Sequence, residues 1–471
     1  MSARNHEVQG LEVRRPQPQR SDRLRSQLLC PRAGLSDEPG APLVTPIVQS
    51  TSFGQVPGGS AEFAYSRVSN PTVAALERAL GDLEGAPPAV TFASGLAAET
   101  GLLLALVRAG DRVVCGRAVY GGTTRLLQQL LPGLGVETVF VDATDGAALA
   151  TAITPGTRLV IIETPANPTL ELTDIEAASR LAHDAGALLA VDNTFLTPVL
   201  QRPLDLGADL TVTSTTKLIE GHSAALGGSV VSRDEALLER LRFVRKSTGA
   251  IQSPFGAWTT LQGIKTLALR VERQSQTAAQ VAEHLSRCEA VSRVYYPGLA
   301  GDGALAERQH AGAHGAVVSF ELTGGYAGAR SLLDGLRLCR LAEHVGSVET
   351  LVTHPASMTH ADVSAADRRA AGLPDGLLRL SVGLEPACAI VEDFDRALDA
   401  VCSGAPVAGA DLSEDPERGD PATLRERPEA PVTQAAIAND HGAERAAAPD
   451  AAGDSGALSA TVAARSEGGV R

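Results

Sequence analysis

The strongest chemical signal in the sequence is a short segment in which an apolar, strand-like run ends in hydroxyl residues and a lysine. Residues 210–217 read LTVTSTTK, so the hydroxyls of Ser214 and Thr216 stand beside the Lys217 amine. Hydroxyls can bind a phosphate, and an amine can attack a carbonyl. Only three of the 41 basic residues are lysines (Lys217, Lys246 and Lys265), so few side chains could supply that amine. An amine beside a phosphate site favours pyridoxal phosphate as a cofactor, and the alternative is a surface lysine after a strand.

A carboxylate stands at the end of another predicted strand, 25 residues before the lysine. Asp192 follows the apolar run 188–191. A carboxylate in such a place can pair with a protonated pyridine nitrogen and so keep the cofactor an electron sink. An aspartate that caps a turn is the alternative, and Lys217 on the neighbouring strand makes it less favoured.

Two further segments offer groups for a phosphate. Gly95 and Leu96 stand between a predicted strand and a helix, where the backbone N–H groups of a helix N-terminus attract anions. Tyr65 and Arg67 precede another predicted helix, and a phenol with a guanidinium could bind a phosphate from outside.

Three side chains at or inside predicted strands complete the candidate site. Tyr120 stands in the glycine turn YGGT and could stack on a flat cofactor. Asn167 follows a strand that ends at Glu163, and Pro168 restricts its backbone. Arg379 lies within an apolar strand and needs an anion, which a substrate carboxylate or a structural salt bridge would supply.

Short apolar runs that alternate with helical patterns must position these residues. This alternation predicts an α/β fold with a large, mostly parallel sheet, helices on both faces and ligands at the carboxyl ends of the strands. After Pro254 the pattern changes to a long helix over about residues 255–287, followed by a smaller α+β domain. The predicted strands are 89–92, 112–115, 137–141, 158–162, 188–191 and 210–214, with further strands at about 291–296 and 316–322.

Composition and patterning divide the chain into five parts. We expect a disordered extension over 1–25, an N-terminal arm over 26–68, a large cofactor-binding domain over 69–255, a C-terminal domain over 256–404 and a disordered tail over 405–471.

The overall composition excludes several classes of function. A formal charge of −14 argues against nucleic acid as a partner. No apolar stretch approaches the roughly 20 residues of a membrane-spanning helix, and the N-terminus does not resemble a secretory signal. Six scattered cysteines without CxxC spacing fit a reducing cytoplasm, and the spacing of His354 and His360 does not favour zinc, so we expect no metal.

Taken together, the motifs resemble the pyridoxal-phosphate enzymes of cysteine and methionine metabolism, which include cystathionine γ-synthase and γ-lyase, methionine γ-lyase and the O-acylhomoserine sulfhydrylases. The resemblance covers about residues 29–401 and implies the PLP-dependent transferase fold, fold type I. Its motifs are YSRVSNPT at 65–72, ASGL at 93–96, YGGT at 120–123, ETPANP at 163–168, VDNTF at 191–195, STTK at 214–217, YPGL at 296–299, HPASMTH at 354–360 and RLSVGLE at 379–385.

The resemblance also implies a role for each candidate residue. It implies that substrates are small amino acids and that the chain forms a homotetramer of active-site-sharing dimers. The implied roles are a covalent cofactor link at Lys217, a pyridine partner at Asp192, phosphate ligands at Ser214, Thr216, Gly95 and Leu96, further phosphate ligands at Tyr65 and Arg67 from a neighbouring subunit, ring stacking by Tyr120, a contact from Asn167 to the phenolic oxygen, and carboxylate binding by Arg379.

The sequence departs from the family pattern in three places. Glu220 replaces a small residue, Ala224 stands where many members have aspartate, and His344 replaces a serine near the expected carboxylate site. In the family that the chain resembles, a glutamate at the position of Glu343, just before His344, occurs in members that act on cystathionine or cysteine. Glu343 and His344 are therefore candidate substrate-binding residues.

The resulting hypothesis is γ-elimination or γ-replacement on cystathionine or an O-acylhomoserine, with Lys217, Tyr120 and Asp192 in catalytic roles. O-acylhomoserine sulfhydrylation, methionine γ-elimination and transamination are alternative reactions. A catalytically silent protein of the same fold, with a regulatory role, is the alternative outside enzymes.

Overall fold

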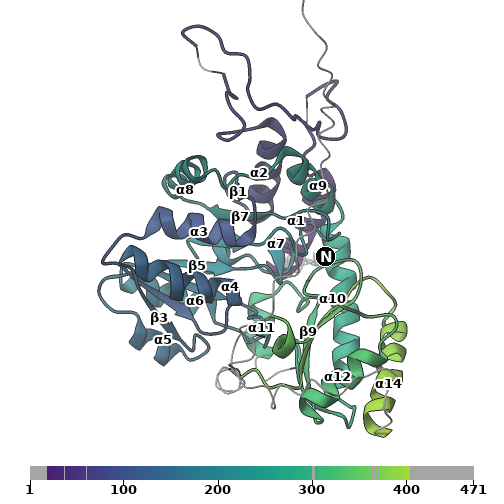
Figure 1. Cartoon of the computed structure of the whole chain (residues 1–471). Coiled ribbons are helices and arrows are strands. Elements are labelled where there is room, and N and C mark those ends of the chain that lie inside the picture. The colour runs from purple at the N-terminus through teal and green to yellow at the C-terminus, as the bar shows by residue number, and fades with distance from the viewer. Residues whose placement is uncertain are drawn as a thin grey trace, which may run out of the picture. The chain divides into compact units, whose positions relative to one another are not determined.

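The computed structural model describes residues 18–403, except for residues 37, 60, 300–302, 360, 362–367 and 369–371 (Figure 1). The predictions for residues 1–17 and for the tail 405–471 therefore lie outside the described residues, as does His360.

Part of the segment expected to be disordered is helical. We expected residues 1–25 to lack structure, but helix α1 spans Pro18–Leu29 and is followed by a 3-10 turn, Cys30–Arg32. The reason is tertiary contact, since Ser26 and Cys30 are buried. The Arg25 guanidinium also donates to the Asp82 carbonyl at 2.7 Å, which secures the helix to the end of helix α2, Pro71–Glu84.

A seven-stranded sheet forms the larger part of the fold and confirms the predicted α/β class. Strands β2 to β6 are parallel to one another, whereas β7 runs antiparallel to β6 and to β1. The sequence did not predict β7. Each of the other strands of this sheet begins and ends within one or two residues of its predicted boundary. In sheet order the strands are β1 Val90–Phe92, β7 Gly228–Ser232, β6 Leu210–Thr213, β5 Leu188–Asp192, β4 Thr157–Glu163, β2 Arg112–Gly116 and β3 Glu137–Val141.

Helices cover both faces of this sheet (Figure 1). In β4, Leu159 and Ile161 pack in the core shared with α3 and α8, while Val160 and Ile162 pack in the core shared with α5 and α6. A strand buried on both faces must be apolar at every position, which explains its continuous run of aliphatic residues. The helices of this part are α2 Pro71–Glu84, α3 Gly95–Leu106, α4 Gly121–Arg125, α5 Gly146–Ala152, α6 Ile175–Asp184, α7 Thr197–Leu200 and α8 Glu235–Thr248.

A second, five-stranded sheet follows in the chain. Its neighbours are antiparallel except for the parallel pair β10 and β11, and Phe320 and Phe394 meet edge to face in its core at 5.6 Å between ring centroids. Its strands, in sheet order, are β10 Arg340–Leu341, β11 Leu351–Thr353, β12 Leu377–Ser381, β9 Val317–Leu322 and β8 Val291–Tyr295, and the accompanying helices are α11 Gly303–Gln309, α12 Gly325–Gly335 and α14 Ala387–Ser403.

The single long helix expected over residues 255–287 is two helices. Helix α9 spans Pro254–Ile264 and helix α10 spans Leu267–Leu285. The break occurs where the Arg270 side chain binds the α9 end, donating to the Gly263 carbonyl at 2.7 Å, and also reaches the Leu218 carbonyl at 2.8 Å. Arg270 thus ties the helix break to the residue after Lys217.

Among the described residues, no helix has the length and apolar character needed to cross a membrane. The domain limits at 68/69 and 255/256 stay predictions.

Candidate active site

The candidate site forms at the carboxyl edge of the large sheet. Glu163 and Asp192 are register partners at the ends of β4 and β5. Strand β6, paired with β5, ends at Thr213 and leads directly into the turn that contains Ser214 and Lys217. The sheet order therefore brings the predicted carboxylate and the predicted lysine to one edge, as the sequence indicated.

Backbone hydrogen bonds fix the turn that carries Lys217. The Lys217 N–H donates to the Ser214 carbonyl at 3.2 Å, and the Gly221 N–H donates to the Lys217 carbonyl at 2.8 Å. Burial, followed by the positive charge of Arg379, lowers the pKa of Lys217 to about 8, although Glu343 opposes the shift. A lysine amine in this position is neutral in a substantial fraction of molecules near pH 8 and can accept protons.

An anion cradle lies beside the lysine turn. Helix α3 begins at Gly95 after the N-cap Ser94, whose side chain accepts from the Ala97 N–H at 3.1 Å. A Cβ at Gly95 would lie 2.7 Å from the Ser214 Cβ, so glycine is required for the helix N-terminus to approach the turn this closely. The helix N-terminus and the Ser214 hydroxyl together fit a phosphate group.

Thr216, the other predicted phosphate ligand, is already engaged. Its hydroxyl donates to the Gly227 carbonyl and accepts from the Gly227 N–H, both at 3.0 Å. These bonds hold the turn against the start of strand β7. If Thr216 donated to a phosphate, its hydroxyl hydrogen would have to turn away from Gly227.

Three carboxyl groups gather near the cradle, of which the sequence singled out one for the site. Burial raises the pKa of Asp192, which accepts from the Thr194 N–H at 2.8 Å. Burial and then the charge of Asp192 raise the pKa of Glu99 to about 8 and the pKa of Glu163 well above its usual range. A cationic partner such as a protonated pyridine nitrogen would offset the cost of burying Asp192 in its ionised form.

Glu99 and Glu163 could have been found from the sequence. Glu99 is a lone acid in the apolar segment of α3, and Glu163 ends a predicted strand just as Asp192 does. In the structure Glu163 positions Tyr120, because its carboxylate accepts from the Tyr120 N–H at 2.6 Å. The Tyr120 ring packs so closely over Gly122 that a Cβ there would lie 2.4 Å from its Cε1.

Arg379 lies on β12 of the second sheet, and its side chain extends to Asn167, which follows β4 of the large sheet. It is 5% exposed, and its guanidinium donates to the Asn167 Oδ1 at 2.7 Å and to the Thr353 Oγ1 at 3.1 Å. Burial lowers its pKa to about 10, against the charges of Glu163 and Glu343. Its Nε is buried and has no hydrogen-bond partner in the described part of the chain. This guanidinium can bind a carboxylate, and Asn167 keeps its Nδ2 donors for a cofactor oxygen.

Glu343 and His344 lie near Arg379. The His344 carbonyl accepts from the Arg379 guanidinium at 3.3 Å, and its Nδ1 is 3.4 Å from the Lys217 Nζ. Glu343 is exposed, and its charge acts on both Lys217 and Arg379.

Tyr65 and Arg67 are the predicted site residues that the structure does not bring to the lysine. Arg67 donates to the Lys246 carbonyl at 2.6 Å and stacks over the Tyr65 ring at 5.3 Å. No contact from either side chain to Lys217 or Gly95 is found within the described ranges. Their role toward a neighbouring subunit stays a prediction.

Glu220 and Ala224, which follow Lys217 and depart from the family pattern, are joined by a hydrogen bond. The buried Glu220 carboxylate accepts from the His222 N–H at 3.0 Å and from the Ala224 N–H at 3.1 Å. Glu220 thereby secures the loop that contains Ala224.

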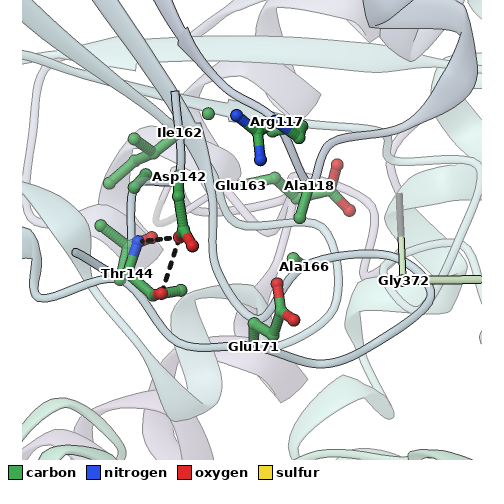
Figure 2. A pocket seen from close by; sticks show the side chains of 12 residues that line it. Arg117, Ala118, Asp142, Thr144, Ile162, Glu163, Ala166, Glu171 and Gly372 are labelled. Atoms are coloured by element: carbon green, nitrogen blue, oxygen red, sulfur yellow. Dashed lines mark hydrogen bonds between the residues drawn. The ribbon is translucent and has the colours of Figure 1, made fainter. Parts of the chain in front are cut away.

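A separate pocket of about 210 Å³ opens at the ends of β2, β3 and β4 (Figure 2). Arg117, Asp142, Glu163 and Glu171 line it, and Asp142 accepts from the Thr144 N–H at 3.0 Å and from its hydroxyl at 2.7 Å. The pocket shares Glu163 with the site but not Lys217, and its carboxylates make it unsuitable for a phosphate.

The fit of these groups defines a class of protein. A lysine whose pKa is lowered by burial, an anion cradle and a buried acid that needs a cation are what a pyridoxal-phosphate enzyme of fold type I requires, and the three occur on one edge of a mostly parallel sheet. Comparison with known families agrees with this class. The model described as "Cys/Met metabolism PLP-dependent enzyme" matches residues 32–399, and the chain belongs to that family.

Individual relatives cover most of the chain. It is 44% identical to a cystathionine gamma-lyase of Mus musculus over 362 residues, which is 76% of this chain and 90% of the relative. It is 40% identical to an L-methionine gamma-lyase of Fusobacterium nucleatum subsp. polymorphum over 372 residues, 76% of this chain and 94% of the relative. A crystal structure of cystathionine gamma synthase from Xanthomonas oryzae pv. oryzae matches with a TM-score of 0.78 and 41% identity, covering 81% of this chain and 99% of that one.

Membership confirms pyridoxal phosphate as the cofactor and the chain as an enzyme of the γ-lyase and γ-synthase type. The silent-protein alternative is therefore set aside.

Proposed function

We propose that this enzyme catalyses γ-elimination on cystathionine, which with one water gives cysteine, 2-oxobutanoate and ammonia. The observation that carries the proposal is Glu343, an exposed carboxylate whose charge acts on both Lys217 and Arg379. Cystathionine carries a second ammonium group beyond its sulfur, whereas methionine has none. A carboxylate at the mouth of the site can pair with that distal ammonium.

The residues that would hold the cofactor are Lys217, Asp192, Ser214 and the N-terminus of α3, with Tyr120 against its ring. Bound there, pyridoxal phosphate supplies an electron sink for the electrons of the substrate Cα–H bond. Asp192 would hold the proton on the ring nitrogen, because an ionised carboxylate beside that nitrogen favours its protonated form.

Arg379 would bind the substrate α-carboxylate. Its guanidinium is held by Asn167 and Thr353, so the carboxylate meets a group of fixed position. Fixing one end of the substrate orients the Cα–H bond toward Lys217, and orientation of this kind lowers barriers by an amount on the order of 7 kcal/mol in favourable systems.

Lys217 would carry the protons. Its neutral amine would accept the Cα proton and pass it on to the cofactor. Neutral again, the amine could then accept a proton from Cβ, after which the bond from Cγ to sulfur would break. Tyr120 follows β2, which is parallel to β4 and ends at the same edge of the sheet. Its phenol would donate a proton to the departing sulfur, so that cysteine leaves as a thiol.

A second candidate is γ-replacement, in which cysteine adds to the same carbon of an O-acylhomoserine. The similarity to a cystathionine gamma synthase structure that was determined with cysteine favours it. Both reactions need the same residues up to the loss of the γ-substituent. A cytoplasmic homotetramer, in which Tyr65 and Arg67 complete a neighbouring site, is proposed for either reaction.

Product analysis tests the proposal. The full-length enzyme is incubated separately with cystathionine, with methionine, and with O-succinylhomoserine plus cysteine, and the products are identified by mass spectrometry. We expect the highest specificity constant for cystathionine, with cysteine and 2-oxobutanoate in equal amounts. A higher specificity constant for methionine would refute the proposed substrate, and net cystathionine synthesis alone would favour γ-replacement.

A further inference from the structure

Three side chains of the kinds that bind transition metals meet where the end of α10 approaches α14 (Figure 1). They are His284, Cys288 and Asp395, and their ligand atoms, an imidazole nitrogen, a sulfur and a carboxylate oxygen, all lie within 4.8 Å of one another. Arg270, near the start of α10, contacts the residue after Lys217, and His284 lies about 21 Å further along the same helix at 1.5 Å per residue. The cluster is therefore separate from the cofactor site.

The packing of one hydrophobic core fixes the two helices that carry these ligands. Val281 and Leu285 on α10 and Phe394 and Leu398 on α14 are buried in the same cluster. Cys288 lies just after the end of α10, in a turn closed by its N–H, which donates to the Leu285 carbonyl at 3.1 Å. The three side chains thus project from backbone segments whose separation is set by the core, as a metal site requires.

The electrostatics of the cluster favour a cation. His284 is in the last turn of α10, where the unpaired carbonyls form the negative end of the helix dipole. Asp395 brings one negative charge, and Cys288 brings a second when a metal displaces the thiol proton. The arginines adjacent to the cluster in sequence are paired with their own carboxylates, Arg287 with Glu283 and Arg396 with Asp393.

The donor set fits zinc. Zn²⁺ binds imidazole nitrogen, thiolate and carboxylate in tetrahedral geometry, which puts a nitrogen and an oxygen ligand about 3.3 Å apart. The His284 Nε2 and the Asp395 Oδ1 are now 2.6 Å apart, so they would separate by about 0.7 Å to admit the ion. Their side chains are 33% and 49% exposed and can rotate by this amount. The exposed side leaves room for water as a fourth ligand.

We propose that His284, Cys288 and Asp395 form a zinc site that joins the end of α10 to α14. Binding forms one bond from zinc to each ligand atom; the thiol proton passes to solvent, and any hydrogen on Nε2 moves to Nδ1 or to solvent. The sequence led us to expect no metal, because Asp395 lies 111 positions after His284 and only the fold brings them together. The site does not depend on which reaction the enzyme catalyses.

Zinc binding by the full-length enzyme with its cofactor tests the proposal. The protein is freed of metal with a chelator and dialysed against a series of free Zn²⁺ concentrations, and the bound zinc is measured by elemental analysis. The nearly isosteric ligand variants are His284→Gln, Cys288→Ser and Asp395→Asn.

Two further variants are matched controls. His183→Gln removes an imidazole that pairs with Asp209 at 2.9 Å and belongs to no three-ligand cluster in the part of the chain that the structure describes. Cys388→Ser removes an exposed cysteine of α14.

We expect one zinc per chain that the wild type and both controls bind equally and that each ligand variant binds at least about tenfold more weakly. Co²⁺ in place of zinc should give the intense visible absorbance of a tetrahedral cobalt–thiolate centre in the wild type but not in Cys288→Ser. Zinc should also raise the Tm of the wild type and leave that of Cys288→Ser unchanged, because the site exists only in the folded chain. No zinc binding by the wild type, or the same affinity in Cys288→Ser as in the wild type, would overturn the inference.

Discussion

Replacing Glu343 by valine tests how the enzyme chooses its substrate. Glu343 is exposed and acts electrostatically on Lys217 and Arg379, so it borders the place where the substrate binds. Because solvent screens the charge, its pair with the distal ammonium of cystathionine contributes at most about 1 kcal/mol. That free energy corresponds to about a fivefold loss in the specificity constant for cystathionine. Methionine and homoserine esters, which lack the second ammonium, should change little or improve.

The assay compares kcat/KM for cystathionine, methionine and O-succinylhomoserine at one pH, in the wild type, Glu343→Val and Glu343→Gln. Loss of the Glu343 charge also lowers the pKa of Lys217 for every substrate, so the ratio between substrates is the informative quantity. The glutamine variant keeps the size of the side chain and should reproduce most of the cystathionine loss. An equal loss on all three substrates would show that Glu343 is structural and would refute the reasoning.

The remaining predictions concern the cofactor site. Lys217→Ala should abolish turnover and the absorbance of bound cofactor, whereas Lys246→Ala and Lys265→Ala should keep both; residual turnover in the first variant would contradict its assignment. The pKa of Lys217, lowered to about 8, implies that kcat falls about tenfold per pH unit on the acidic side of that value, because the protonated amine cannot accept a proton, and a profile flat to pH 6 would argue against it. Gly95→Ala should weaken cofactor binding about tenfold, since its Cβ would lie 2.7 Å from the Ser214 Cβ, while Gly146→Ala, with open space at its Cβ, should not; equal affinities in a binding titration would contradict the cradle.

The sequence predicted the large sheet well because its strands carry a local signal. Strands buried on both faces, such as 188–191, are apolar at every position and are bounded by turns. Lys217 and Asp192 could be placed at one edge because the ends of parallel strands meet there.

The errors arise where distant contacts decide the structure. At the break between α9 and α10, Arg270 binds carbonyls at the α9 end and after Lys217, and no local pattern reveals the contact with the residue after Lys217. The composition of residues 18–25 predicts disorder because it does not reveal the packing of this segment against α2. The contact of His344 with Lys217 joins residues 127 positions apart, so the sequence could mark His344 as unusual but could not show its partner.

The most direct test of the account is to locate the cofactor on the chain. Borohydride reduction of the loaded full-length enzyme makes the link to the lysine permanent, and peptide mass spectrometry then identifies the modified residue among Lys217, Lys246 and Lys265. We predict stoichiometric modification of Lys217 alone. Cofactor found on Lys246 or Lys265, with Lys217 unmodified, would contradict the central claim that the carboxyl edge of the large sheet is the active site.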